Sequence, residues 1–177
     1  MNICYNNIKV NKQFINSIYT RNKPKININL ICKNNKYYTL VMNDPNAPIG
    51  NYIHWVIINL VCNNNIITLE NNGITLVNYK KPSPPKNSNI HNYIFSLYEQ
   101  DDLIILNSKL ISSIPNVINN IDLLNLIKIS KKTPIVSNYF ISYFTNNKNN
   151  KNNKNNTKKI IRKFGGKTKT KTKNKKN

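Results

Sequence analysis

The chain has 177 residues and a formal net charge of +21 at pH 7, with only six acidic side chains. Residues 146–177 carry 13 of the positive charges and no acid, so about 145 residues remain to build a core, which suits one domain. No segment reaches the roughly 20 consecutive apolar residues of a membrane-spanning helix, and the N-terminus lacks a signal-peptide core. We therefore expect a cytoplasmic, intracellular protein.

The apolar residues are mainly Ile, Leu, Val and Tyr, which favours sheet over helix. Hydrophobic periodicity predicts strands over residues 25–33, 37–42, 52–61, 66–69, 74–77, 90–98 and 135–144. Asn71, Asn72 and Gly73 separate the fourth and fifth of these strands and predict a β-hairpin there. One helix is predicted from Pro115 to about Lys128, because apolar residues recur at three- and four-residue spacing and proline suits the first turn.

Asp44 is the first candidate functional residue. It ends a strand-prone run, Pro45 follows it directly, and Pro48 lies four residues further on. Because proline disfavours helical geometry in the residue before it, Asp44 is held extended at a strand end. His54 opens the next apolar run, so a carboxylate and an imidazole are expected together at the mouth of the sheet. This pattern indicates the floor of a small polar pocket.

The second histidine of the chain has a similar setting. Residues 79–86 form a proline-stiffened loop that leads into a strand beginning at His91. Residues two apart on a strand share a face, so His91 and Tyr93 point the same way. His54 and His91 are the only histidines, and each opens a strand after a proline-bearing loop. We therefore predict that the two imidazoles converge.

These blocks resemble the phosphatidylethanolamine-binding protein family, which includes the Raf kinase inhibitor protein. The matching blocks are Asp44-Pro45-Asn46-Ala47-Pro48, His54-Trp55, Ser83-Pro84-Pro85-Lys86, and His91-Asn92-Tyr93 followed by Tyr98-Glu99-Gln100. The resemblance covers roughly residues 5–145. It implies a mainly β fold, a large antiparallel Greek-key β-sandwich with one or two short helices, and a small pocket for phosphate-type head groups. The residues that match the pocket lining are Asp44, Pro48, His54, Pro84, His91 and Tyr93.

Three positions depart from the family pattern. The second acid of the first block is Asn46, and the arginine that usually follows the second histidine is Asn92, so the ion pair expected between these positions cannot form. Phe140 takes the place of a pocket tyrosine. The resemblance also implies a cis peptide bond between Ala47 and Pro48, since a bond to proline is where cis costs least.

The resemblance implies non-catalytic binding of a phosphorylated small molecule or phospholipid head group, without a cofactor. His54, His91 and Tyr93 would donate hydrogen bonds to phosphate oxygens, and Asp44 would orient a histidine or accept from an amine. One alternative is a protein-interaction regulator, a kinase or protease inhibitor that docks through the pocket rim. A metal site made of Asp44, His54 and His91 is a less favoured alternative. A hydrolase is less favoured again, because no Gly-x-Ser-x-Gly elbow is present.

The Asn-, Lys- and Thr-rich segment 146–177 is expected to be disordered, because its dense like charge and scarce apolar residues cannot form a core. Its charge suits loose binding to nucleic acid or to an anionic membrane surface, which leaves a polyanion-binding packaging protein as a further alternative. The asparagine-rich composition indicates an AT-rich genome, such as that of a large DNA virus. Packaging in a virion is the corresponding expectation.

The chain has three cysteines, Cys4, Cys32 and Cys62. Their spacing matches no metal site, and an odd number cannot close into a complete set of disulfides. We therefore expect free, partly buried thiols in a reducing compartment.

Overall fold

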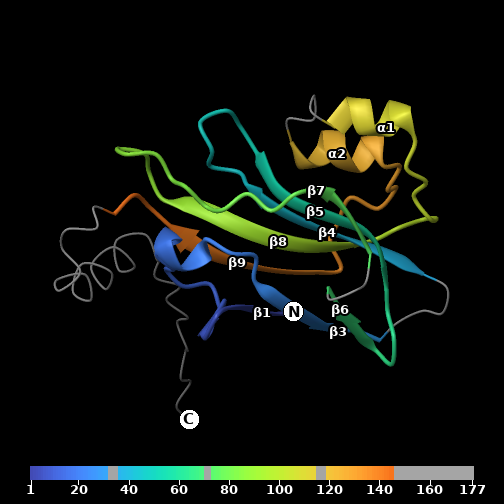
Figure 1. Cartoon of the computed structure of the whole chain (residues 1–177), viewed down its shortest axis with the longest axis horizontal. Helices are drawn as coiled ribbons and strands as arrows, with labels where there is room; N and C mark the ends of the chain where they lie inside the picture. The colour runs from blue at the N-terminus through green and yellow to red at the C-terminus, as the bar shows by residue number, and fades with distance from the viewer. Residues whose placement is uncertain (32–35, 70–72, 115–118, 146–177) are drawn as a thin grey trace, which may run out of the picture. The chain divides into compact units, whose positions relative to one another are not determined.

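The structure, a computed structural model, describes residues 1–31, 36–69, 73–114 and 119–145. Within these ranges the chain forms two antiparallel β-sheets, two short α-helices and one turn of 3-10 helix, η1 (Ser17–Thr20) (Figure 1). The segment 146–177, for which disorder and polyanion binding are predicted, lies outside the described residues. No helix in the described ranges has the length and apolar character needed to span a bilayer.

The first sheet has four strands in the order β2-β1-β3-β6, and the second has five in the order β7-β5-β4-β8-β9. The strands of the first sheet are β1 (Asn2–Tyr5), β2 (Ile8–Lys9), β3 (Lys25–Asn29) and β6 (Ile66–Thr68). Those of the second sheet are β4 (Tyr37–Asp44), β5 (Tyr52–Val61), β7 (Ile74–Val77), β8 (His91–Glu99) and β9 (Val136–Ser142). All pairings between these strands are antiparallel, and the predicted mainly β fold is confirmed.

The main core lies between the two sheets. Tyr93, Phe95 and Leu97 alternate along β8 on one face, each at most 1% exposed, and belong to the same apolar cluster as Ile26 and Ile28 of β3. The shared face predicted for His91 and Tyr93 is confirmed, since their rings stack at a centroid distance of 6.3 Å. Tyr93 lies near the start of β8, so the core-facing side of this strand continues to that end of the sheet.

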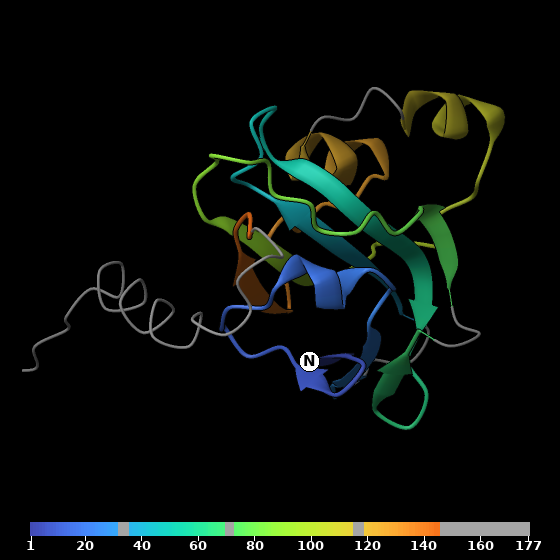
Figure 2. The same cartoon turned by 60° about the vertical axis from the view of Figure 1, so that its left-hand side comes forward.

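A second core covers the outer face of the five-stranded sheet. The helices α1 (Ser108–Ser113) and α2 (Asn120–Leu126) lie over this face, on the side away from the first sheet (Figure 2). Leu123 and Leu124 of α2 form one apolar cluster with Val41 of β4 and Val56 of β5. Because β4 and β5 are buried on both faces, their sequences are continuous apolar runs rather than alternating ones.

Each helix begins at an asparagine cap. The Asn107 side chain accepts a hydrogen bond from the Leu110 backbone N–H, and the Asn119 side chain accepts one from that of Asp122. Helix α2 lies within the predicted helix, whose first residue, Pro115, lies outside the described residues. Helix α1 was not predicted, because one and a half turns are too short to show an amphipathic period.

The predicted hairpin is wrong. Strand β6 pairs with β3 in the first sheet, whereas β7 pairs with β5 in the second, so the chain crosses between the sheets. Gly73 lies at the end of this crossover with φ +81°, and a Cβ there would meet the Ile57 and Leu60 side chains and the Ile58 carbonyl at 2.8 Å. The glycine therefore serves close packing on β5 as well as a turn.

The cysteines differ from expectation at one position. Cys4 is a partly buried free thiol, as expected. Cys62, in contrast, is disulfide-bonded, so the expectation of free thiols is wrong for this residue. Cys32 lies outside the described residues.

We expect Gly73→Ala to lower the free energy of unfolding by about 2–4 kcal/mol, because the methyl group would add both overpacking and a positive-φ penalty. Gly50→Ala is the matched control, since Gly50 also has a positive φ, +96°, but its Cβ would have no atom within 4 Å. This control should lose only about 1–2 kcal/mol. Urea unfolding measures both values, and equal losses would contradict the close approach at Gly73.

Candidate functional site

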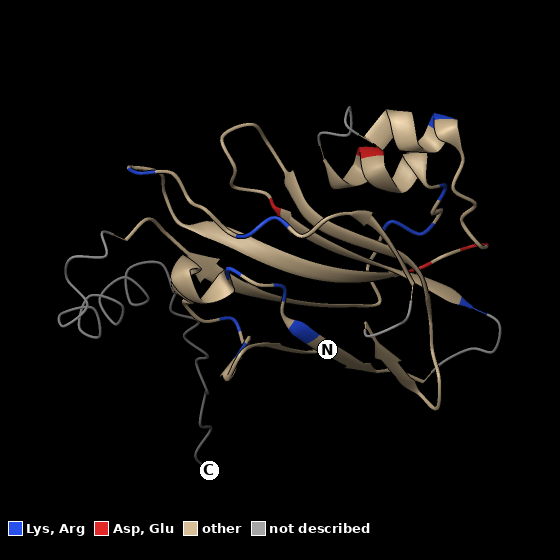
Figure 3. Cartoon of the chain, viewed as in Figure 1, with Lys and Arg blue, Asp and Glu red and all other residues tan. Residues whose placement is uncertain are grey.

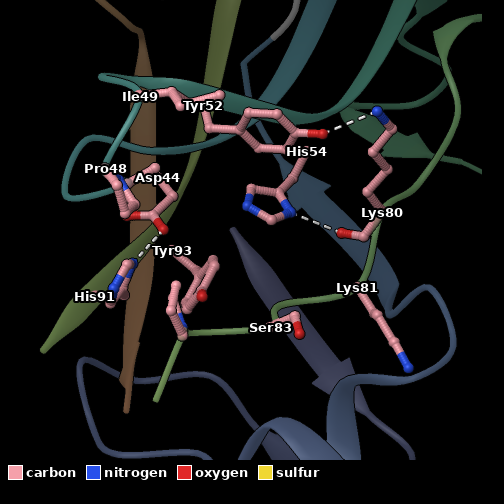
Figure 4. Close-up of a pocket in the computed structure, with 12 residues that line it drawn as sticks. Asp44, Pro48, Ile49, Tyr52, His54, Lys80, Lys81, Ser83, His91 and Tyr93 are labelled. Atoms are coloured by element: carbon pink, nitrogen blue, oxygen red, sulfur yellow. Dashed lines mark hydrogen bonds and ion pairs between the residues drawn. The ribbon is translucent and has the colours of Figure 1, made fainter. Parts of the chain in front are cut away.

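A cavity of about 370 Å³ opens where the β4–β5 connection faces the segment leading into β8 (Figure 4). Five of the six predicted pocket residues line it: Asp44, Pro48, His54, His91 and Tyr93. The sixth, Pro84, is buried, and the next residue, Pro85, contributes to the wall instead. The predicted convergence of the two histidine-bearing blocks is therefore present in the geometry.

Asp44 and His91 form a buried pair on this wall. Asp44 ends β4 and His91 begins β8, and because these neighbouring strands are antiparallel the two residues lie at the same edge of the sheet. Asp44 Oδ2 lies 2.6 Å from His91 Nδ1, and both side chains are only 3% exposed. The other carboxylate oxygen, Oδ1, accepts a hydrogen bond from the Asn46 backbone N–H at 2.9 Å. Both oxygens of Asp44 are thus engaged by the protein itself.

Both ring nitrogens of His91 have partners within the protein. Nδ1 lies 2.6 Å from Asp44 Oδ2 and donates to it, because a carboxylate accepts. Nε2 lies 2.9 Å from the Ser88 hydroxyl, which is also 2.8 Å from the Pro85 carbonyl. His91 therefore has no ring nitrogen left to face the cavity.

The rim of the pocket is closed by uncharged groups where the family pattern has an ion pair. Asn92 Nδ2 donates to Asn46 Oδ1 at 2.8 Å, and the Asn92 backbone N–H donates to the same oxygen at 3.0 Å. An amide contact between Asn46 and Asn92 thus stands where the family pattern has an ion pair. This contact ties the β4–β5 connection to β8 without adding charge to the rim.

His54 presents a different nitrogen arrangement. Its Nδ1 donates to the Lys80 carbonyl at 2.8 Å, because a carbonyl can only accept, and its other ring nitrogen points into the cavity toward Asp44 and Tyr93 (Figure 4). Burial lowers the pKa of His54 from its ordinary value, although the Lys80 hydrogen bond and Asp44 act in the opposite direction. At neutral pH, His54 Nε2 is therefore unprotonated and faces the cavity as an acceptor.

Tyr93 supplies a proton donor beside His54. Burial, and then the charge of Asp44, raise the pKa of Tyr93 well above its ordinary value, so the phenol keeps its proton. Its ring stacks on Phe140 at a centroid distance of 5.1 Å and meets the edge of the His54 ring at 5.2 Å. Phe140, fully buried, thus supports the Tyr93 ring and brings no hydroxyl of its own.

The peptide bond between Ala47 and Pro48 is trans, so the predicted cis bond is wrong. The Gly50 backbone N–H donates to the Ala47 carbonyl at 2.9 Å, which closes a four-residue turn with Pro48 in its second position. Proline suits that position in the trans form, whereas a cis proline occupies the third position of its own turn type. The short connection between β4 and β5 therefore reverses direction without a cis bond.

The wall also contains residues that sequence reasoning missed, namely Ala47, Ile49, Tyr52, Lys80, Lys81 and Ser83. Two signals were present in the sequence. Tyr52 lies two residues before His54 on the same strand and so shares its face. Lys80 and Lys81 stand in the same proline-stiffened loop as Pro84, which was assigned to the pocket.

The described residues contain no group of three His, Cys, Asp or Glu side chains placed to hold a metal ion. Asp44 and His91 are bonded to each other, and the Nδ1 of His54 is bonded to a backbone carbonyl. These contacts leave the three residues of the alternative metal site without a common centre.

Comparisons with known proteins identify the family of the chain. The family model for phosphatidylethanolamine-binding proteins matches residues 7–140. A 26 kDa secreted antigen of Toxocara canis is 30% identical over 116 residues, which cover 62% of this chain and 41% of the antigen. A UPF0098 protein of Pyrococcus abyssi is 26% identical over 115 residues, covering 54% of this chain and 65% of that protein. The chain thus spans less than two thirds of the length of these relatives.

Solved structures share the fold. Carboxypeptidase Y inhibitor, solved in complex with its cognate proteinase, has a TM-score of 0.60 at 22% identity, with 81% of this chain and 82% of the inhibitor covered. The phosphatidylethanolamine-binding protein of Plasmodium vivax has a TM-score of 0.61 at 18% identity, with 81% and 84% covered. Since the family model also matches well over half of the sequence, the chain belongs to the phosphatidylethanolamine-binding protein family.

Proposed function

We propose that the pocket binds the phosphate of a small molecule or a phospholipid head group, without catalysis. The observation that carries this proposal is the convergence of the Tyr93 hydroxyl, the free nitrogen of His54 and two lysines around one cavity of about 370 Å³. A cavity of this size is at the small end of the roughly 300–1,000 Å³ that ligand sites occupy. A compact polar group therefore suits it better than a large apolar ligand.

Charge supports an anion as the ligand. Among the described residues of the wall, Asp44 is the only acid, and its two oxygens are bonded to His91 and to the Asn46 backbone N–H. Lys80 and Lys81 complete the wall, so its uncompensated charge is positive. Basic residues also outnumber acidic ones across the described part of the chain (Figure 3). An anionic group gains from this field, whereas a cation is repelled.

The roles of the two histidines differ in this proposal from the sequence expectation. Both nitrogens of His91 are already bonded, so His91 holds Asp44 rather than reaching the ligand. His54 and Tyr93 are the groups that contact the phosphate. His54 needs a proton on Nε2 to donate to a phosphate oxygen, and an approaching anion favours that protonation.

Tyr93→Phe removes one proton donor and keeps the ring. We expect it to weaken binding of phosphoethanolamine by about 10- to 100-fold, the range for a hydrogen bond to a charged group. Isothermal titration calorimetry on the full chain measures the change. Tyr98→Phe is the control, because Tyr98 lies on the same strand but belongs to the apolar cluster under the helices. If both variants bind as the unsubstituted protein does, Tyr93 makes no contact with the ligand.

The pH dependence follows from His54. Its pKa in the free protein lies below the ordinary value of about 6.5, and a bound anion raises it. The affinity for a phosphodiester, whose charge is constant in this range, should therefore rise as pH falls from 7.5 and level off only below pH 6.5. Titrations of dimethyl phosphate from pH 7.5 to 5 measure this slope. His54→Gln should abolish it, and a pH-independent affinity in the unsubstituted protein would argue against His54.

A second candidate is regulation of a protein partner, a protease or kinase, through the pocket rim. It is favoured by the likeness in fold to carboxypeptidase Y inhibitor, which was solved with its cognate proteinase. Tyr93→Phe separates the two functions. The Tyr93 hydroxyl lies inside the cavity and only 1% of the residue is exposed, so a partner docked on the rim does not reach it. Loss of phosphate binding with partner inhibition intact would support a docking function that is independent of the ligand.

A further inference from the structure

We propose that this pocket selects doubly charged phosphate monoesters over singly charged phosphodiesters, and that Lys80 determines this preference. The inference rests on the proposed phosphate-binding function and adds the charge class of the ligand. It follows from how the acidic and basic side chains of the wall are held.

The acidic side chain of the wall is engaged by the protein. Asp44 Oδ2 lies 2.6 Å from His91 Nδ1, and Oδ1 accepts from the Asn46 backbone N–H. Both the Asp44 and the His91 side chains are only 3% exposed. His54 donates its Nδ1 proton to the Lys80 carbonyl and adds no charge until Nε2 is protonated. One engaged carboxylate therefore stands against the two lysines of the wall.

Lys80 is positioned by neutral groups. Its Nζ donates to the Tyr52 hydroxyl at 2.8 Å and lies 5.3 Å from the centre of the Tyr52 ring. Tyr52 in turn packs edge-on against His54 at 4.9 Å. A hydroxyl and an aromatic face orient an ammonium without cancelling its charge. The contact therefore holds a full positive charge beside the imidazole that faces the ligand.

Neither Lys80 nor Lys81 forms an ion pair within the described ranges. Figure 4 shows the Lys80 ammonium at the Tyr52 hydroxyl, above His54, and the Lys81 ammonium turned away from this contact. Lys81 thus adds to the general field of the cavity, whereas Lys80 is directed by a specific contact. This difference makes Lys80 the residue expected to distinguish ligands by charge.

The two classes of ester differ by about one charge. A monoester carries roughly −1.5 to −2 near pH 7, because its second pKa is near 6, while a diester carries one negative charge. Two uncompensated lysines match the monoester. Since both lysines are exposed, solvent screens them, and we expect a preference of about tenfold rather than several orders of magnitude.

The test uses the full chain and a minimal pair of ligands, methyl phosphate and dimethyl phosphate, titrated at pH 7.5. We expect the unsubstituted protein to bind the monoester about tenfold more tightly, and Lys80→Met to reduce this ratio to about two or less. Lys80→Met leaves the backbone carbonyl that holds His54 unchanged. Lys80→Arg should keep the preference, since it keeps the charge.

Lys109→Met is the matched control, because it removes the same charge from an exposed position on α1. This control should keep the preference for the monoester at about tenfold. The basic segment 146–177 is present in every variant and therefore does not affect the comparison. Equal affinities for the two esters, or an equal loss of preference in Lys109→Met, would overturn the role of Lys80 and leave phosphate binding intact. Failure of both esters to bind the unsubstituted protein would overturn the proposed function itself.

Discussion

The buried contact between Asp44 and His91 is the interaction on which the pocket depends. It joins the end of β4 to the start of β8, so each residue is placed by a strand whose other side chains fill the core. Two connections are bonded to it, one through the Asn46 backbone and one through the Ser88 hydroxyl. Removing one partner of a buried pair typically costs about 3–5 kcal/mol, because the other charge is left without compensation. The pocket floor is therefore tied to the stability of the sheet.

A second buried polar group fixes the opposite end of β4. Gln100 accepts from the Thr39 hydroxyl at 2.9 Å and from the Asn59 backbone N–H at 2.7 Å, and it donates to Asn59 Oδ1 at 2.9 Å. Asn59 lies at a bulge in β5 with φ +57°. Because a register slip would leave these amides unsatisfied, the network holds β4 against β5 and β8. Strands β4, β5 and β8 carry Asp44, His54 and His91, so the same network also holds the strands on which these three pocket residues lie.

Much of this arrangement could be predicted from sequence because it is local. The apolar run over Tyr52–Val61 predicted β5 with the observed bounds, and Pro45 marked the end of β4 at Asp44. The failures concern long-range geometry. Periodicity locates β6 and β7 but not the sheet that each joins, so the hairpin was wrong. The position of the Lys80 ammonium depends on the Tyr52 hydroxyl, 28 residues away, and no local pattern reports such a contact.

The most direct measurement is an imidazole nitrogen NMR spectrum of the full chain at pH 6.5, with and without methyl phosphate. Only His54 and His91 contribute, so one His54→Gln spectrum assigns both. Without ligand, His54 should show a protonated Nδ1 with a bare Nε2. Saturating methyl phosphate should protonate the His54 Nε2 and leave the His91 signals unchanged. A His54 spectrum that the ligand does not change would contradict phosphate binding in this pocket.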